Sequence, residues 1–136
     1  MGEDIARQKC VVLCNRHAGM MGGIRGLMGT LFESVIMVAE ETSLLNAVKK
    51  LRTDLVLVDL SFPVSGETGV ASFLLQHAPG VKFIVLGTED APEVVDACVA
   101  AGASGYLLKW TAGKDLVKAV ETVRSGLTYV PARPAG

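Results

Sequence analysis

The chain has 136 residues, the length of one domain, and half of them are hydrophobic, which is enough to build a core. Its formal net charge of -1 gives no electrostatic basis for nucleic-acid or membrane binding by this chain. No apolar run reaches membrane-spanning length. Three cysteines, with no CxxC pair and no secretion signal, indicate reduced thiols and a cytoplasmic location.

Strand-like and helix-like patterns alternate along the chain. Continuous apolar runs, rich in Val, Ile and Leu, are typical of strands that are buried on both faces of a parallel sheet. The N-terminal residues 1–8 are polar and are expected to be flexible. The predicted strands cover residues 10–14, 34–39, 55–59, 81–86 and 105–109.

Each predicted strand is followed by a segment with helical spacing of its apolar residues. Thr42 or Ser43 is expected to cap the second helix, and Pro92 to lie in the first turn of the fourth. Gly102 and Gly126 are expected just past the ends of the last two helices. The predicted helices cover residues 18–32, a stretch from the cap to residue 52, and residues 70–78, 92–101 and 113–125.

The first predicted helix carries a stripe of glycines, each of which costs about 1 kcal/mol relative to alanine inside a helix. We rank a weak, mobile helix first and a face that another helix or chain can approach closely second. A phosphate-binding loop ranks a distant third, because neither GxGxxG nor GxxxxGK[ST] is present. The glycines are Gly19, Gly22, Gly23, Gly26 and Gly29.

Five strand–helix pairs predict an α/β fold with a parallel sheet covered by helices on both faces. The third strand ends abruptly in Asp59. Open α/β sheets bind their ligands at the carboxyl ends of the strands, so Asp59 is a candidate site residue. The alternative is a solvated aspartate that merely ends a strand, and this stretch alone does not decide between them.

Two stretches carry a resemblance to a known family, Asp54-Leu-Val-Leu-Val-Asp59-Leu-Ser-Phe-Pro63 and Ala101-Gly-Ala-Ser-Gly-Tyr-Leu-Leu-Lys109. Over residues 9–130 the chain resembles the receiver domain of two-component response regulators, of the CheY-like superfamily. It is most similar to receivers that precede a LuxR-type helix-turn-helix domain. The resemblance implies a flavodoxin-like (βα)5 three-layer sandwich with a five-stranded parallel sheet in the order 2-1-3-4-5. Residues 131–136 would be a tail or the start of a linker.

The resemblance also implies roles for three residues. Asp59 would accept a phosphoryl group from a histidine kinase, Lys109 would pair with that phosphate, and Tyr106 would change rotamer between inactive and active states. The chemistry agrees, because a carboxylate can form an aspartyl phosphate and a lysine supplies a compact positive charge. For Tyr106, an aromatic that simply packs is an equal alternative.

The chain departs from the family pattern where two adjacent acids normally hold Mg²⁺. Asn15 and Arg16 stand at those positions. Mg²⁺ prefers carboxylate and phosphate oxygens, so Asp59 is expected to bind it weakly at best, and no other cofactor is expected. Arg16 could instead pair with Asp59 and partly replace the metal, or extend into solvent.

A second departure follows the fourth strand, where the family places a Ser or Thr whose hydroxyl binds the phosphoryl group. Gly87 takes that position, and Thr88 comes next. Thr88 could substitute only if the loop were shifted by one residue, which we do not expect. Both switch positions are therefore degenerate.

The sequence predicts an atypical receiver that is not an enzyme and that acts through protein contacts or dimerisation. The expected surface comprises the fourth helix, fifth strand and fifth helix, with Trp110 as an exposed contact residue. Within a longer chain such a domain could control transcription. The first alternative is a working phosphoswitch, phosphorylated on Asp59 by a histidine kinase or a small donor. The second is a small-molecule binder or flavodoxin-like enzyme that uses the cleft at Asn15, Asp59 and Lys109.

Overall fold

The computed structural model describes residues 8–17, 21–65 and 69–131. Its five strands form one parallel sheet in the order β2-β1-β3-β4-β5, which confirms the predicted flavodoxin-like fold. Apart from Gln8 and Pro131, the expected flexible N-terminus and C-terminal tail lie outside the described residues. The strands are β1 (Gln8–Cys14), β2 (Phe32–Val38), β3 (Leu55–Asp59), β4 (Lys82–Gly87) and β5 (Gly105–Leu108).

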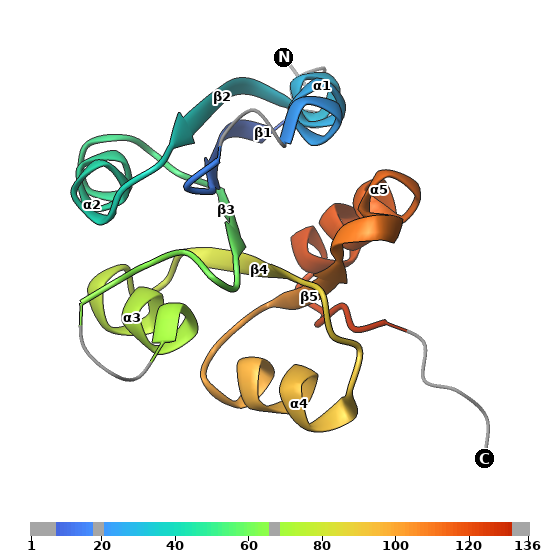
Figure 1. Cartoon of the computed structure of the whole chain (residues 1–136). Helices are drawn as coiled ribbons and strands as arrows, with labels where there is room; N and C mark the ends of the chain where they lie inside the picture. Colours follow the sequence, from blue (N-terminus) through green and yellow to red (C-terminus); the bar gives the residue numbers. More distant parts are fainter. Residues whose placement is uncertain (1–7, 18–20, 66–68, 132–136) are drawn as a thin grey trace.

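Helices cover both faces of the sheet, so that the molecule has three layers. α1 and α5 lie side by side on one face, and α2, α3 and α4 cover the other (Figure 1). A short 3-10 helix, η3 (Lys109–Thr111), connects β5 to α5. The helices are α1 (Gly22–Leu31), α2 (Glu41–Lys50), α3 (Gly69–His77), α4 (Pro92–Ala100) and α5 (Ala112–Arg124).

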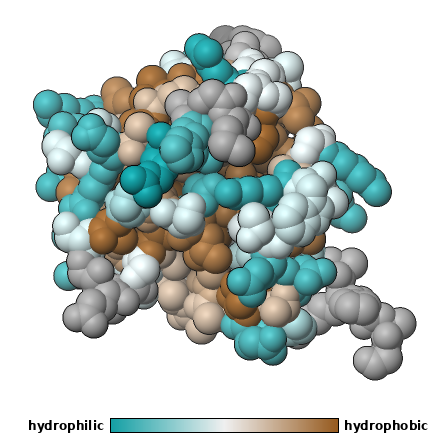
Figure 2. Space-filling view, in the orientation of Figure 1, coloured by the Kyte–Doolittle hydropathy of each residue, from teal (hydrophilic) through white to brown (hydrophobic). Residues whose placement is uncertain are grey.

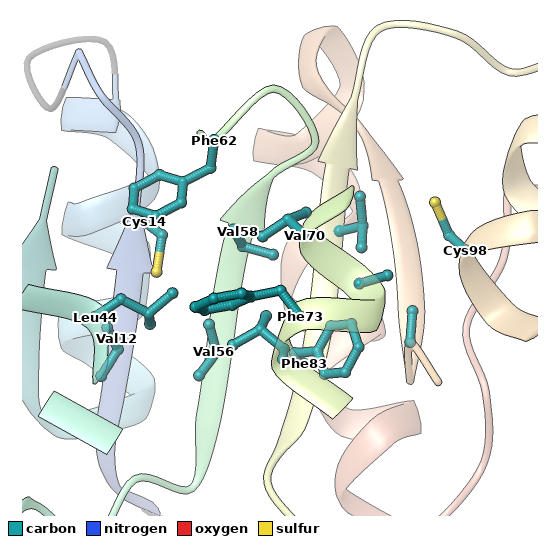
Figure 3. Close-up of a cluster of buried hydrophobic side chains, with 14 of the residues drawn as sticks. Val12, Cys14, Leu44, Val56, Val58, Phe62, Val70, Phe73, Phe83 and Cys98 are labelled. Carbon is teal, nitrogen blue, oxygen red and sulfur yellow. The ribbon is translucent and has the colours of Figure 1, made fainter. Parts of the chain in front are cut away.

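Each face of the sheet has its own hydrophobic core. On the face covered by α2, α3 and α4, Phe73 of α3 lies against Val56 and Val58 of β3 (Figure 3). On the other face, Leu13 packs in one cluster with Leu116 of α5. All five residues of β3 are buried, as its uninterrupted apolar run predicts for a central strand. The last of those five is Asp59, so the strand ends in a buried carboxylate.

The predicted cap of the second helix is wrong. α2 begins at Glu41, its N-cap residue is Glu40, and no side-chain hydrogen bond caps it. Thr42 and Ser43 therefore lie inside the first turn. The carboxylate of Glu41 accepts a hydrogen bond from the Ser65 hydroxyl (2.9 Å), which ties α2 to the loop after β3. The helix also ends at Lys50, short of the predicted residue 52.

The first helix is shorter than predicted. It spans Gly22–Leu31, and its predicted first residues, 18–20, lie outside the described residues. Phe32 has extended backbone angles (φ -128°, ψ 148°) and already belongs to β2. Phe32 is fully buried, so its side chain belongs to the core although the helical pattern stops there.

The glycine stripe of α1 faces outward. A Cβ built on Gly22, Gly23, Gly26 or Gly29 would meet nothing within 4 Å, so no other described part of this chain packs closely against the stripe. Gly19 lies outside the described residues. The structure therefore does not show a close-packing face within the chain.

Replacing Gly26 with alanine is expected to stabilise the protein by up to about 1 kcal/mol, because α1 gains helix propensity without a steric clash. Chemical denaturation measures the change. The matched control is Gly102→Ala, where φ is +113° and the new Cβ would lie 3.1 Å from Leu75 Cδ1, so this variant is expected to lose stability. A loss of stability or of self-association in Gly26→Ala would instead indicate that the stripe contacts another chain.

After α5 the chain returns to the edge of the sheet. Tyr129 forms a parallel bridge with Gly105, and its carbonyl accepts a hydrogen bond of 2.9 Å from the Tyr106 backbone N–H. A side chain at Gly105 would crowd this contact, because its Cβ would lie 3.2 Å from the Tyr129 oxygen. The glycine therefore permits the close approach of the returning segment.

The exterior mixes hydrophilic residues with scattered apolar ones, as Figure 2 shows for one face. Among the large hydrophobic residues that the structure describes, Trp110 is the most exposed, at 66% of its surface, and Leu127 follows at 65%. In the described ranges, no helix is both long and apolar enough to cross a membrane.

Candidate functional site

The register of the sheet brings the candidate residues to one edge. Asp59 ends β3 and pairs with Leu86 of β4, and Gly87 pairs with Leu108 of β5. Lys109 follows directly after β5. Since all strands are parallel, these residues meet at the carboxyl edge of the sheet, where the fold places ligands.

Asp59 is a buried carboxylate with four donors from its own chain. The ammonium group of Lys109 lies 2.6 Å from Asp59 Oδ2, and the Asn15 amide Nδ2 donates to the same oxygen over 3.1 Å. The other oxygen, Oδ1, accepts hydrogen bonds from the Ser61 backbone N–H (2.8 Å) and the Ser61 hydroxyl (2.6 Å). Only 5% of the Asp59 side chain is exposed. Both carboxylate oxygens are therefore satisfied internally.

These contacts keep Asp59 ionised. Burial would raise the pKa of Asp59, but the hydrogen bonds from Lys109 and Ser61, together with the lysine charge, outweigh burial and lower the pKa below its ordinary value of 3.8. A buried carboxylate without these partners would be costly to maintain. The site therefore holds a stable anion at neutral pH.

The orientation of Asn15 is set from its other side. Its Oδ1 accepts a hydrogen bond of 2.7 Å from the backbone N–H of His17, which leaves Nδ2 to face Asp59. Asn15 is one of two buried polar or charged residues in the described part of the chain, and Asp59 is the other. Asn15 therefore presents a hydrogen-bond donor where a metal ligand would present an oxygen.

The described side chains at the site offer few of the oxygen ligands that Mg²⁺ prefers. Asp59 is already paired with Lys109, and Asn15 directs N–H rather than oxygen toward it. Within residues 8–17, 21–65 and 69–131, no three His, Cys, Asp or Glu side chains are grouped so that they could hold a metal ion. Arg16 is exposed, and the salt bridge at Asp59 is made by Lys109 instead.

Two small cavities flank the ion pair. The first, of about 290 Å³, is lined by Asp59, Leu60, Ser61, Gly87, Thr88 and Lys109. The structure thus places the degenerate positions Gly87 and Thr88 in the same cavity as the carboxylate and the lysine. The second, of about 270 Å³, is lined by Asn15, Met21, Ile24, Leu86, Lys109 and Trp110.

Tyr106 lies inside the protein. None of its surface is exposed, and its hydroxyl donates a hydrogen bond of 2.7 Å to the backbone carbonyl of Glu89. Burial raises the pKa of the Tyr106 hydroxyl above its ordinary value of 10.0. The ring packs in the core between the sheet and α4, with Val85 and Cys98 among its neighbours in that cluster. Tyr106 is therefore separate from Trp110, which lies on the surface.

Sequence reasoning did not single out Ser61, although it makes two of the four hydrogen bonds to Asp59. The signal was present, because an aspartate that accepts from the backbone N–H two residues later is a common turn. The sequence pattern marks Asn15 as a position that lacks a metal-binding acid. Its direct hydrogen bond to Asp59 depends on the spacing of β1 and β3, which the sequence alone does not supply.

The sequence is similar to a family of known function. Residues 11–121 match the family model of the response regulator receiver domain. The chain is 29% identical over 133 residues to the transcriptional regulatory protein DegU of Brevibacillus brevis, covering 96% of this chain and 56% of that protein. It is 31% identical over 123 residues to the response regulator UvrY of Escherichia coli (strain K12), covering 88% of this chain and 56% of that protein. The chain thus spans little more than half the length of these curated relatives.

The fold is similar to that of a solved structure. The non-phosphorylated receiver domain of the stress response regulator RcsB from Escherichia coli superimposes with a TM-score of 0.81 at 25% identity. That match covers 93% of this chain and 100% of the other.

Proposed function

Because this chain belongs to the response-regulator receiver family, we propose that it is an atypical receiver that signals through protein contacts rather than through Mg²⁺-dependent phosphorylation. The family match confirms the predicted resemblance to receivers, and the relatives DegU and UvrY confirm the likeness to receivers of LuxR-type regulators. The observation that supports the proposal is that both carboxylate oxygens of Asp59 are already paired with groups of this chain. Lys109, Asn15 and Ser61 occupy both of its oxygens.

Phosphoryl transfer needs the negative charge of the transferring oxygens to be neutralised, commonly by a metal ion and a cation. Here the cation, Lys109, is present, but Asn15 and Arg16 stand where the family has its two metal-binding acids. Gly87 also removes the hydroxyl that the family uses beside the phosphoryl group. Two supporting parts of the phosphorylation chemistry are therefore missing. As a member of the receiver family, the domain would have a regulatory rather than an enzymatic role.

A phosphoswitch is the second candidate, and one observation favours it. The cavity of about 290 Å³ beside Asp59 is lined by Lys109 and by the exposed Thr88, whose hydroxyl could contact a phosphoryl oxygen. In this case Asp59 would receive its phosphoryl group from a histidine kinase or a small donor. Mg²⁺ would be weakly bound at most.

The contact surface we propose consists of α4, β5 and α5, with Trp110 beside it. Trp110 directly follows Lys109, so an exposed aromatic lies next to the ion pair. Tryptophan is enriched at interface hot spots, and this surface could hold a second copy of the domain. DegU is named as a transcriptional regulator, and its match to this chain covers 56% of its length. Any control of transcription by this domain would therefore need a further part of a regulator, beyond the receiver that matches here.

The test is the intact mass of the protein after incubation with acetyl phosphate, with and without Mg²⁺. Transfer would join the phosphorus to an Asp59 oxygen and release acetate. We expect no adduct in either condition. The Asp59→Asn variant controls for modification elsewhere, and an Asn15→Asp/Arg16→Asp variant, which restores both acids, serves as the positive control.

An adduct that requires both Mg²⁺ and Asp59 in the unmodified protein would refute the proposal and establish the phosphoswitch. An adduct at Asp59 without Mg²⁺ would also contradict it, and would point to Arg16 as a substitute for the metal beside Lys109.

A further inference from the structure

The burial of Tyr106 depends on a neighbour that has no side chain. Tyr106 pairs with Val85 of β4, and its ring extends along the sheet toward the carboxyl edge as far as Gly87. A Cβ on Gly87 would lie 2.1 Å from Tyr106 Oη, 2.7 Å from Cζ and 3.3 Å from Cε2. The first two distances are far inside van der Waals contact. The tip of the ring therefore fills the space that a side chain at Gly87 would need.

The backbone gives no competing reason for glycine at this position. Gly87 is not among the glycines with positive φ, which are Gly69, Gly80, Gly102 and Gly126. It is the last residue of a regular parallel strand, where any residue could adopt the conformation. The requirement for glycine is therefore steric, and it comes from Tyr106.

The tyrosine also holds the loop between β4 and α4. Its hydroxyl donates to the carbonyl of Glu89, two residues beyond Gly87, from inside the protein. Moving the ring outward would break this hydrogen bond and leave a cavity in the core against α4. The loop and the start of α4 are thus anchored to β5 through one buried side chain.

We propose that Gly87 and Tyr106 form a steric lock, which holds Tyr106 buried and fixes the β4–α4 loop in one arrangement whatever the state of Asp59. Gly87 lines the Asp59 cavity, but it has no side chain that could transmit a change there to the ring. The face formed by α4 and β5 therefore stays permanently in the conformation with the tyrosine inside. The lock does not depend on whether Asp59 accepts a phosphoryl group.

The test measures the solvent exposure of Tyr106 under native conditions. The chain has two tyrosines, so ¹³C-labelled tyrosine gives two sets of ring signals, which a Tyr129→Phe variant assigns. A soluble gadolinium chelate broadens the signals of exposed rings. We expect the Tyr106 signals to resist broadening in the unmodified protein, and the half-buried Tyr129 to serve as an internal reference.

Gly87→Ser is expected to drive Tyr106 outward, so that its broadening reaches or exceeds that of Tyr129. The matched control is Gly113→Ser on α5, where a new Cβ meets nothing within 4 Å and Tyr106 is expected to stay shielded. Asp59→Asn is also expected to leave Tyr106 shielded. Shielding that persists in Gly87→Ser, or that is lost in Asp59→Asn, would overturn the lock.

If Gly87→Ser is too unstable for spectroscopy, a double variant tests whether Tyr106 is the group that excludes a side chain at position 87. Tyr106→Leu shortens the side chain and removes the atoms that collide with a Cβ at position 87. The lock predicts that Gly87→Ser/Tyr106→Leu is more stable than Gly87→Ser alone. Equal or lower stability of the double variant would show that Tyr106 is not the obstacle.

Discussion

Lys109→Met is expected to lower the free energy of unfolding by about 2 kcal/mol at neutral pH. Removing the lysine leaves Asp59 as a charge with 5% of its side chain exposed and no cationic partner in its place. Removing one member of a fully buried ion pair typically lowers the free energy of unfolding by more than this. The estimate is reduced because 34% of the Lys109 side chain is exposed and because Asn15 and Ser61 still donate to the carboxylate.

Urea denaturation of the two proteins measures this difference, which corresponds to a fall in Tm of roughly 6–10 °C. The exposed Lys114 supplies the matched control, since Lys114→Met removes the same charge from the surface of α5. The Lys109→Met/Asp59→Asn double variant is expected to regain part of the lost stability, because a neutral amide replaces the unpaired carboxylate. A loss no greater than that of Lys114→Met would mean that Asp59 does not depend on the ion pair.

The same measurement has a defined dependence on pH. The folded-state pKa of Asp59 lies below its ordinary value of 3.8, so the ionised group stabilises the protein above that value. This contribution is lost as the pH falls through the lowered folded-state pKa. The difference in the free energy of unfolding between the unmodified protein and Lys109→Met should therefore be largest near neutral pH and become smaller in acid.

Asn15→Asp is expected to make the stability of the domain depend on Mg²⁺. The new carboxylate oxygen would stand about where Nδ2 now lies, 3.1 Å from Asp59 Oδ2. Lys109 can neutralise only one of two carboxylates at this distance, so the pair would carry an excess negative charge and would offer Mg²⁺ more of the oxygen ligands that it prefers. When Mg²⁺ is at ten times its Kd, binding would stabilise the variant by about 1.4 kcal/mol.

Thermal denaturation with chelator and with millimolar Mg²⁺ measures this effect. The unmodified protein is expected to show no Mg²⁺-dependent rise in Tm. Asn46→Asp makes the same change of charge at an exposed position on α2, and any general effect of salt on an added acid would appear there too. A Mg²⁺-dependent rise in the unmodified protein would contradict our description of the site.

The fold was largely predictable because its signals are local and agree with one another. The apolar run that ends in Asp59 predicts β3 residue for residue, and Pro92 and Gly102 bracket α4 as expected. The cap of α2 was not predictable from local preference. Glu41 is held by Ser65, a contact that exists only once the sheet has brought the loop after β3 beside α2.

The candidate site was predictable as a set of positions but not as a set of contacts. The resemblance to receivers placed Asp59, Lys109 and Asn15 at one edge, and the structure brings them together. That Asn15 donates to Asp59 rather than leaving a gap follows from the parallel pairing of β1 with β3. The steric need for glycine at position 87 comes from Tyr106, which lies two positions away in register on the neighbouring strand, and no local pattern reveals this proximity.

The segment that returns after α5 has a protective consequence. An edge strand exposes unpaired N–H and C=O groups, to which a strand of another molecule can add and so begin aggregation. On β5 these groups are partly covered, because Tyr129 accepts from the Tyr106 N–H, and its own N–H donates to the carbonyl of Ser104. Gly105, by leaving space for Tyr129, lets the chain shield its own sheet from unwanted polymerisation.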